Sequence, residues 1–296
     1  MKKLLIIIPI VILITACGKI ESIKAKDPIL ETKVEAEIEE EYAVNSEGTI
    51  VGERYPTPKD YTRVEVEENS FGEFLRNQKL KPYGEKAFYY DGRVKNSAGI
   101  YDSVFDVDIG DRDLHQCADA VMLLRAEYLY SQGLYDEISF HFVSGFNAEY
   151  KKWMQGYRIK VQGNSVSYYK ATDPSNSYES FRSYMNMVMA YASTLSLEKE
   201  LEGVDVDDME IGHVFIIAGN PGHAVIIVDM ATNEENEKIF LLAQSYMPAQ
   251  QTQILLNPMD KNLSPWYSLK DKEKLVTPEW KFELDDLKRF WFGYQP

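Results

Sequence analysis

The spacing of apolar residues predicts two long helices. Between Asp113 and Gly133, apolar positions recur about every 3.6 residues, which is the pattern of an amphipathic helix. Asp113 occupies the position of an N-cap, and Gly133 the position of a glycine that closes a helix. A second stretch, from Tyr178 to Leu201, carries a stripe of methionine, valine and leucine. We expect this stretch to be a helix whose stripe faces the core.

Strand patterns dominate the part of the chain after His213. Four β-rich runs, HVFIIAG, HAVIIVDMA, KIFLLAQSY and QTQILL, follow one another with turn residues between them. This spacing predicts an antiparallel meander. With the two helices, it indicates an α+β fold, which we expect to form a single domain over residues 46–296.

One shorter run carries paired carboxylates. Val104 to Ile109 alternates apolar and acidic residues, so it is expected to be a half-buried strand with Asp106 and Asp108 on one face. Paired carboxylates suit a metal site or acid–base chemistry. The solvent face of a strand is the plainer interpretation, and we favour it.

The N-terminus has the features of an export signal. Residues 1–16 combine Lys2 and Lys3 with an apolar run that is short for a membrane span. The sequence ITAC that ends at Cys17 resembles the lipobox of bacterial lipoproteins. The resemblance implies cleavage before Cys17, acylation of its sulfur, and an extracytoplasmic protein held to a membrane by that lipid. The charged residues 17–45 are expected to form a flexible acidic tether.

Charge and cysteine content narrow the possible functions. The net charge of −15 argues against a nucleic-acid partner, which needs a basic surface. With Cys17 assigned to the lipid, Cys117 is the remaining cysteine. A free thiol is unusual outside the cytoplasm. Cys117 lies near the start of the predicted helix, where backbone amides favour a thiolate, although a lone cysteine on a helix is also a common small core residue.

A base and an orienting group are available later in the chain. His223 opens the run HAVIIVDMA. In a symmetric hairpin it faces Tyr246, and Gln244 lies diagonally across on the same face. A slip of one residue would turn Gln244 to the other face. Cys117, His223 and Gln244 therefore form a candidate catalytic triad of nucleophile, general base and orienting amide. No cofactor is implied, and one cysteine with scattered histidines lacks the spacing of a metal site.

These motifs resemble those of the papain-like NlpC-type cell-wall peptidases and related amidases and acyltransferases. The resemblance implies a papain-like core and a cell-wall peptide as substrate. The segments GHVF at Gly212 and HAVII at His223 stand where those families have GD followed by apolar residues, and His with apolar residues and glycine. Two positions depart from the pattern: His213 replaces the usual aspartate, and Gln116 precedes the cysteine.

A second resemblance covers the chain from about Gly48 onward. The strings DLHQCADAVMLLRAEYLY, PGHAVIIVDMA, FLLAQSYMPAQ and LSPWY are similar to the signature of a family of uncharacterised bacterial lipoproteins, known only as a domain of unknown function. It implies one envelope domain and assigns no catalytic residue. Two functions therefore remain open: a cysteine hydrolase or acyltransferase, and a non-catalytic surface lipoprotein that binds glycan, peptide or protein on a degenerate papain-like scaffold.

Overall fold

The computed structural model describes residues 44–96 and 98–291. The predicted signal peptide, the lipidation site at Cys17 and most of the predicted tether lie outside the described residues.

The centre of the fold is a nine-stranded sheet in which every pairing is antiparallel. Seven strands follow the order β2-β11-β10-β9-β8-β15-β7, while β1 pairs with β9 and β12 with β10. The predicted meander is confirmed, because β8 to β11 are consecutive neighbours. The nine strands are β1 (Thr62–Arg63), β2 (Tyr101–Val104), β7 (Leu201–Gly203), β8 (Val214–Ile217), β9 (His223–Thr232), β10 (Lys238–Gln244), β11 (Gln253–Leu255), β12 (Tyr267–Ser268) and β15 (Leu287–Phe290).

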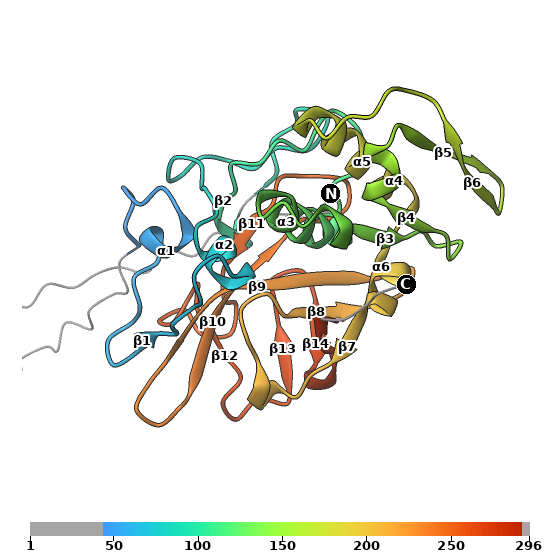
Figure 1. Ribbon diagram of the computed structural model, residues 1–296. Coiled ribbons are helices and arrows are strands. Elements are labelled where there is room, and N and C mark those ends of the chain that lie inside the picture. Colours follow the sequence, from blue (N-terminus) through green and yellow to red (C-terminus); the bar gives the residue numbers. More distant parts are fainter. Residues whose placement is uncertain (1–43, 97, 292–296) are drawn as a thin grey trace, which may run out of the picture. The chain divides into compact units, whose positions relative to one another are not determined.

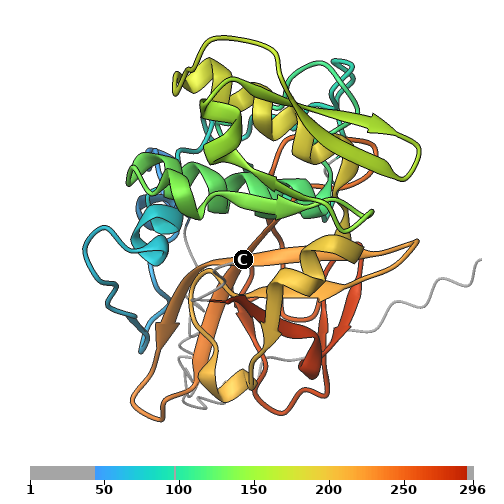
Figure 2. The ribbon, with the colours of Figure 1, turned by 45° about the vertical axis from the view of Figure 1, so that its right-hand side comes forward.

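The central strands are mostly apolar because both faces of the sheet are covered. In β9, Ala224 and Ile226 face one core and Val225 and Ile227 face another. Helix α3 (Cys117–Ser131) packs on the first face, and the hairpin of β13 (Lys274–Val276) and β14 (Lys281–Glu283) closes the second. Figures 1 and 2 show α3 between the sheet and the layer that contains α4 (Tyr150–Met154) and α5 (Tyr178–Tyr191).

The remaining elements are short. Two further hairpins join β3 (Ser139–His141) to β4 (Asn147–Glu149) and β5 (Tyr157–Gln162) to β6 (Ser165–Lys170). The other helices are α1 (Val51–Arg54), α2 (Phe71–Arg76) and α6 (Thr194–Leu197), with 3-10 turns at Tyr135–Glu137, Glu198–Glu200, Val206–Asp208 and Leu284–Asp286. Among the described residues, no helix has the length and apolarity needed to cross a membrane.

The start of the first long helix differs from the prediction. Helix α3 begins at Cys117 and not after Asp113, and its N-cap is Gln116. The backbone N–H of Gln116 donates to Asp119 Oδ2 at 3.1 Å. Asp113 instead accepts from the backbone N–H of Ala249 at 2.7 Å, which ties the loop before α3 to the segment after β10. Gly133 closes α3 as predicted, with φ of +71°, a conformation that glycine adopts without a steric penalty.

Two other predicted elements are shorter than expected. The second long helix ends at Tyr191, and Leu195 lies in the separate helix α6 with 43% of its surface exposed. The predicted strand from Val104 to Ile109 is wrong beyond its first residue, because β2 ends at Val104. After that point the chain leaves the sheet edge, held by an isolated bridge between Leu80 and Phe105.

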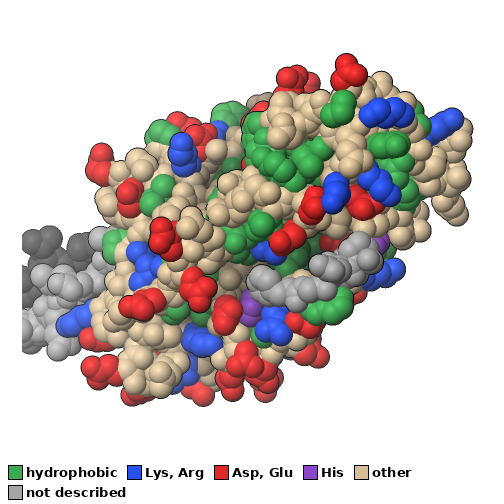
Figure 3. Space-filling model, viewed as in Figure 1, with side chains coloured by type: hydrophobic (Ala, Val, Ile, Leu, Met, Phe, Trp, Pro, Cys, Tyr) green, Lys and Arg blue, Asp and Glu red, His purple; other side chains and the backbone are tan. Residues whose placement is uncertain are grey.

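Charged side chains are distributed over the surface. On the face shown in Figure 3, acidic side chains lie among basic and apolar ones. On this face the acidic side chains are therefore not gathered in a single patch.

Candidate functional site

Cys117 is the first residue of α3, at the end of the helix that lies near the beginning of β9. Its side chain is buried, with 6% of the residue exposed. Burial raises the pKa of the thiol to about 11, and the Asp119 carboxyl adds to the rise, while a backbone hydrogen bond from Ala224 opposes it. The prediction of an easily ionised thiol is therefore wrong, because loss of solvation outweighs the favourable helix terminus.

His223 opens β9 and is 1% exposed. Its Nε2 lies 2.8 Å from Gln244 Oε1, at the end of β10. Three aromatic rings surround the imidazole, with centroids 4.9 Å away for Tyr246, 5.1 Å for Trp280 and 6.0 Å for Phe282. This burial lowers the pKa of the imidazole to about 4, so His223 is neutral at physiological pH.

A β-bulge brings His223 and Gln244 to the same face. Near the turn, Leu241 pairs with Asp229, but Leu242 pairs with Ile227, so that Val228 is an extra residue in β9. Without this shift Gln244 would stand opposite Ile226, on the face that packs against α3. The predicted placement of His223 beside Tyr246 and Gln244 is confirmed, and the bulge is what produces it.

Cys117 and His223 share two neighbours. Ala224, which follows His223, provides the backbone hydrogen bond that favours the thiolate of Cys117. Tyr246, whose ring packs on His223, has its pKa raised by burial and further by Glu279 and Cys117. Within the described ranges no direct hydrogen bond joins the thiol to the imidazole. Some buried side-chain nitrogen and oxygen atoms have no hydrogen-bond partner, but His223 Nδ1 is not one of them.

Sequence reasoning missed the polar residues behind the imidazole. Gln244 Nε2 donates to Glu279 Oε2 at 2.6 Å, and Lys95 Nζ donates to the same oxygen at 2.8 Å. Glu279 and Trp280 belong to the turn between β13 and β14, where the backbone N–H of Thr277 donates to the Trp280 carbonyl. No local pattern marks these positions, because tertiary contacts alone bring them to His223.

With this geometry established, comparison with known proteins assigns a family. A family model described as a domain of unknown function (4846) matches residues 51–289. The chain belongs to this family. The matched range includes Cys117, His223, Gln244 and Glu279. No curated protein and no solved structure gives a significant match.

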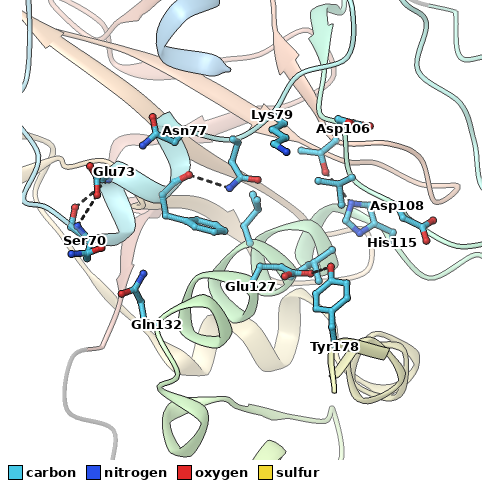
Figure 4. A pocket seen from close by; sticks show the side chains of 17 residues that line it. Ser70, Glu73, Asn77, Lys79, Asp106, Asp108, His115, Glu127, Gln132 and Tyr178 are labelled. Atoms are coloured by element: carbon cyan, nitrogen blue, oxygen red, sulfur yellow. Dashed lines mark hydrogen bonds between the residues drawn. The ribbon is translucent and has the colours of Figure 1, made fainter. Parts of the chain in front are cut away.

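A groove on another part of the domain is the second candidate site. It has a volume of about 600 Å³ and is bordered by α2, α3, the loop at residues 106–108 and the start of α5. Figure 4 shows Asn77, Asp106 and Glu127 among the side chains that line it. Asp106 and Asp108 therefore lie in a loop at this groove and not on the face of a strand.

One histidine lines the groove. His115 is 1% exposed, and its Nε2 lies 2.9 Å from Thr252 Oγ1. Burial lowers the pKa of this imidazole to about 3, so it is neutral at physiological pH. Within residues 44–96 and 98–291, no group of three or more His, Cys, Asp or Glu side chains is placed to hold a metal ion.

Proposed function

We propose that this protein is a lipid-anchored cell-envelope cysteine hydrolase or acyltransferase that acts on an amide bond, with a cell-wall peptide as the substrate class. The observation that carries the proposal is the buried contact of 2.8 Å between His223 Nε2 and Gln244 Oε1, at the end of β9 that also adjoins Cys117. The anchor is Cys17, in the sequence context described above.

Each residue has one role in this reaction. The sulfur of Cys117 attacks the carbonyl carbon of the amide while its proton moves to Nδ1 of His223. The C–N bond then breaks, the imidazolium gives its proton to the leaving amine, and a thioester remains on Cys117. Water in a hydrolase, or an amine or alcohol in a transferase, attacks the thioester and releases the thiol. The unpaired backbone amides at the start of α3 can hold the negative oxygen of the tetrahedral intermediate.

The pKa values disfavour a resting thiolate and imidazolium pair, so the proposed reaction uses general-base catalysis by a neutral pair. The thiol pKa is about 11 and the imidazole pKa is about 4, so both groups are neutral between these limits. The proton therefore moves when the substrate is attacked and not beforehand. This differs from an enzyme that keeps a resting thiolate and imidazolium pair.

A papain-like core is the finer part of the fold proposal. It is supported by the order of the elements: a helix with cysteine as its first residue, then a strand that begins with histidine, then a neighbouring strand that ends with an amide. The helix packs on an antiparallel sheet. This is the arrangement that the NlpC-type resemblance implies.

The pH dependence of alkylation tests the catalytic pair. A thiol with a pKa of about 11 has about one part in ten thousand as thiolate at pH 7, and without a base its alkylation rises tenfold for each pH unit. With His223 as the base, we expect the iodoacetamide rate to be nearly flat from about pH 5 to 9. His223→Asn restores the steep slope and slows the reaction at pH 7 by about a hundredfold.

The control variant is His141→Asn, because His141 lies on β3 and contacts Glu200. It should leave the alkylation profile unchanged. A steep profile in the natural protein, or a profile that His223→Asn does not alter, contradicts the proposal.

The groove favours a second function, the binding of a polar ligand without catalysis. Its amide, carboxylate and aromatic side chains, among them Asn77, Asp106 and Tyr178, are the groups that bind polyhydroxylated molecules by hydrogen bonds and ring contacts. Calorimetry with soluble cell-wall glycan fragments tests this function. Binding that Cys117→Ser preserves and Asp106→Ala weakens supports it, and the absence of binding rejects it.

A further inference from the structure

Behind the imidazole lies a chain of four side chains that we call the relay: Lys95, Glu279, Gln244 and His223. Lys95 Nζ and Gln244 Nε2 both donate to Glu279 Oε2, at 2.8 and 2.6 Å. Gln244 Oε1 then contacts His223 Nε2 at 2.8 Å. Lys95 follows the turn at Gly92, and Glu279 lies in the turn between β13 and β14. His223 begins β9 and Gln244 ends β10.

Charge sets the direction of the hydrogen bonds along the relay. An ionised carboxylate accepts hydrogen bonds and donates none. The ammonium of Lys95, which is 3% exposed, can only donate, so Glu279 Oε2 is the acceptor in this ion pair. Gln244 must therefore turn its NH₂ group to Glu279, and its carbonyl oxygen must face His223.

The orientation of Gln244 in turn decides which nitrogen of His223 carries the proton. A carbonyl oxygen accepts a hydrogen bond, so the Nε2 beside it must be protonated. A neutral imidazole has one protonated nitrogen, and Nδ1 is left with its lone pair. Nδ1 is the nitrogen that the proposed reaction needs as the base.

Aromatic rings cover two members of the relay, whereas the Glu279 side chain keeps 20% exposure. Trp280 and Phe282 pack against the imidazole, and the Lys95 ammonium lies 5.7 Å from the centre of the Tyr246 ring. Burial lowers the pKa of Lys95, and the contact with Glu279 opposes this change. A buried ion pair contributes little to stability compared with apolar packing, so this one calls for a role other than holding the hairpin in place.

We propose that Glu279 and Lys95 are positioning residues that hold His223 in the Nε2–H tautomer, through the amide of Gln244. The catalytic meaning of this tautomer rests on the proposed function, but its existence does not. Tyr246 also packs on His223, and Cys117 adjoins Tyr246 and the backbone of Ala224.

The tautomer can be measured without a substrate. In the full-length chain labelled with ¹⁵N-histidine, a two-bond ¹H–¹⁵N correlation spectrum at pH 7 distinguishes the two nitrogens of each ring. The chain has four histidines, and His223 is the one whose signals disappear in His223→Asn. We expect the Nε2–H form to exceed the Nδ1–H form by about tenfold or more, as hydrogen bonding within a charged chain implies.

Two variants test the origin of this preference. Glu279→Gln provides a neutral partner that can both donate and accept, so the tautomer ratio should fall by about threefold or more. Lys95→Met removes the cation that pairs with Glu279 and should shift the ratio in the same direction. The matched control is Glu283→Gln, in the same hairpin, because Glu283 forms an exposed pair with Lys274 at 2.6 Å. This control should leave the ratio unchanged.

The outcomes separate the relay from the proposed function. A natural protein with mainly the Nδ1–H form, or a ratio that a folded Glu279→Gln variant leaves unchanged, overturns the relay. If the variant does not fold, the spectrum of the natural protein decides. If the tautomer ratio changes as expected but His223→Asn does not alter alkylation, the relay is supported and the proposed catalysis is rejected. If His223→Asn alters alkylation but the tautomer ratio does not change as expected, the catalysis is supported and the relay is rejected.

Discussion

Asp229 offers a sharp test of how burial changes the strength of an ion pair. It is fully buried and lies between two arginines, with Oδ1 2.7 Å from Arg76 Nε and Oδ2 2.9 Å from Arg63 Nε. Asp229→Asn keeps the volume of the side chain but removes its charge, so two guanidinium groups lose their counter-ion. Breaking a buried pair costs about 3–5 kcal/mol. We expect about 3 kcal/mol, since the Arg63 side chain keeps 26% exposure and the Arg76 side chain 14%.

The matched control is Asp91→Asn on the surface. The Arg93 Nε to Asp91 Oδ2 distance is also 2.7 Å, but the two side chains are 67% and 32% exposed. Exposed pairs contribute less than about 1 kcal/mol. The free energy of unfolding is measured in urea by tryptophan fluorescence. If Asp229→Asn costs no more than Asp91→Asn, burial does not decide the strength of these pairs and our reasoning is refuted.

Burial removes solvent from the Asp229 carboxylate, and the two arginines oppose this cost. Apolar residues in place of the whole group avoid the loss of solvation. Replacing all three charged residues together by apolar ones should cost less than Asp229→Asn alone. The free energy of unfolding of the triple variant Arg63→Met, Arg76→Met and Asp229→Leu measures this difference. A triple variant that is less stable than Asp229→Asn would contradict the prediction.

Three further predictions follow from the sequence and the described residues. Cys17→Ala should abolish palmitate labelling and move the protein from the detergent phase to the aqueous phase, and labelling that persists would contradict the lipid anchor. His115 and His213 have folded pKa values of about 3 and 4, below the unfolded value of about 6.5. Their stabilising contribution is therefore complete above pH 6.5 and is lost as the pH falls toward the folded values, by about 1–2 kcal/mol for each at pH 5. Urea unfolding at pH 7 and pH 5 checks this, and His115→Asn should reduce the difference. Gly222→Ala would place a Cβ 2.4 Å from Thr194 Oγ1; we expect a cost of about 1–3 kcal/mol and a lower melting temperature, and an unchanged melting temperature would show that the turn relaxes freely.

Periodicity along the chain was enough to predict the main architecture. The apolar pattern predicted a helix at α3 and the meander from β8 to β11. The helix is not amphipathic as expected, because all residues from Cys117 to Ala126 are buried. A symmetric hairpin gave the correct face for Gln244, although it is the bulge at Val228 that sets this register. These features depend on residues close together in the sequence.

The residue at which α3 begins could not be predicted from the local sequence. Asp113 has the chemistry of an N-cap, but its carboxylate is used by the distant backbone of Ala249. Gln116 takes the cap position, with Asp119 as its partner. Which residue caps a helix therefore depends on the backbone N–H groups that the fold places near each candidate side chain. The residue pattern of a single segment does not show those distant groups.

The protonation of the site was decided by tertiary structure alone. A cysteine at a helix start suggests a low thiol pKa, but the layers packed around Cys117 raise it to about 11, since desolvation depends on all neighbouring segments and not on the helix that carries the residue. Glu279 and Lys95 lie 184 residues apart in the chain and meet only when the hairpin closes over the sheet. Local patterns of apolar and polar residues were sufficient to predict most of the long elements and the residue types they carry. The tertiary structure decided how deeply those residues are buried and which partners they find, because burial and long-range contacts are properties of the whole packed domain.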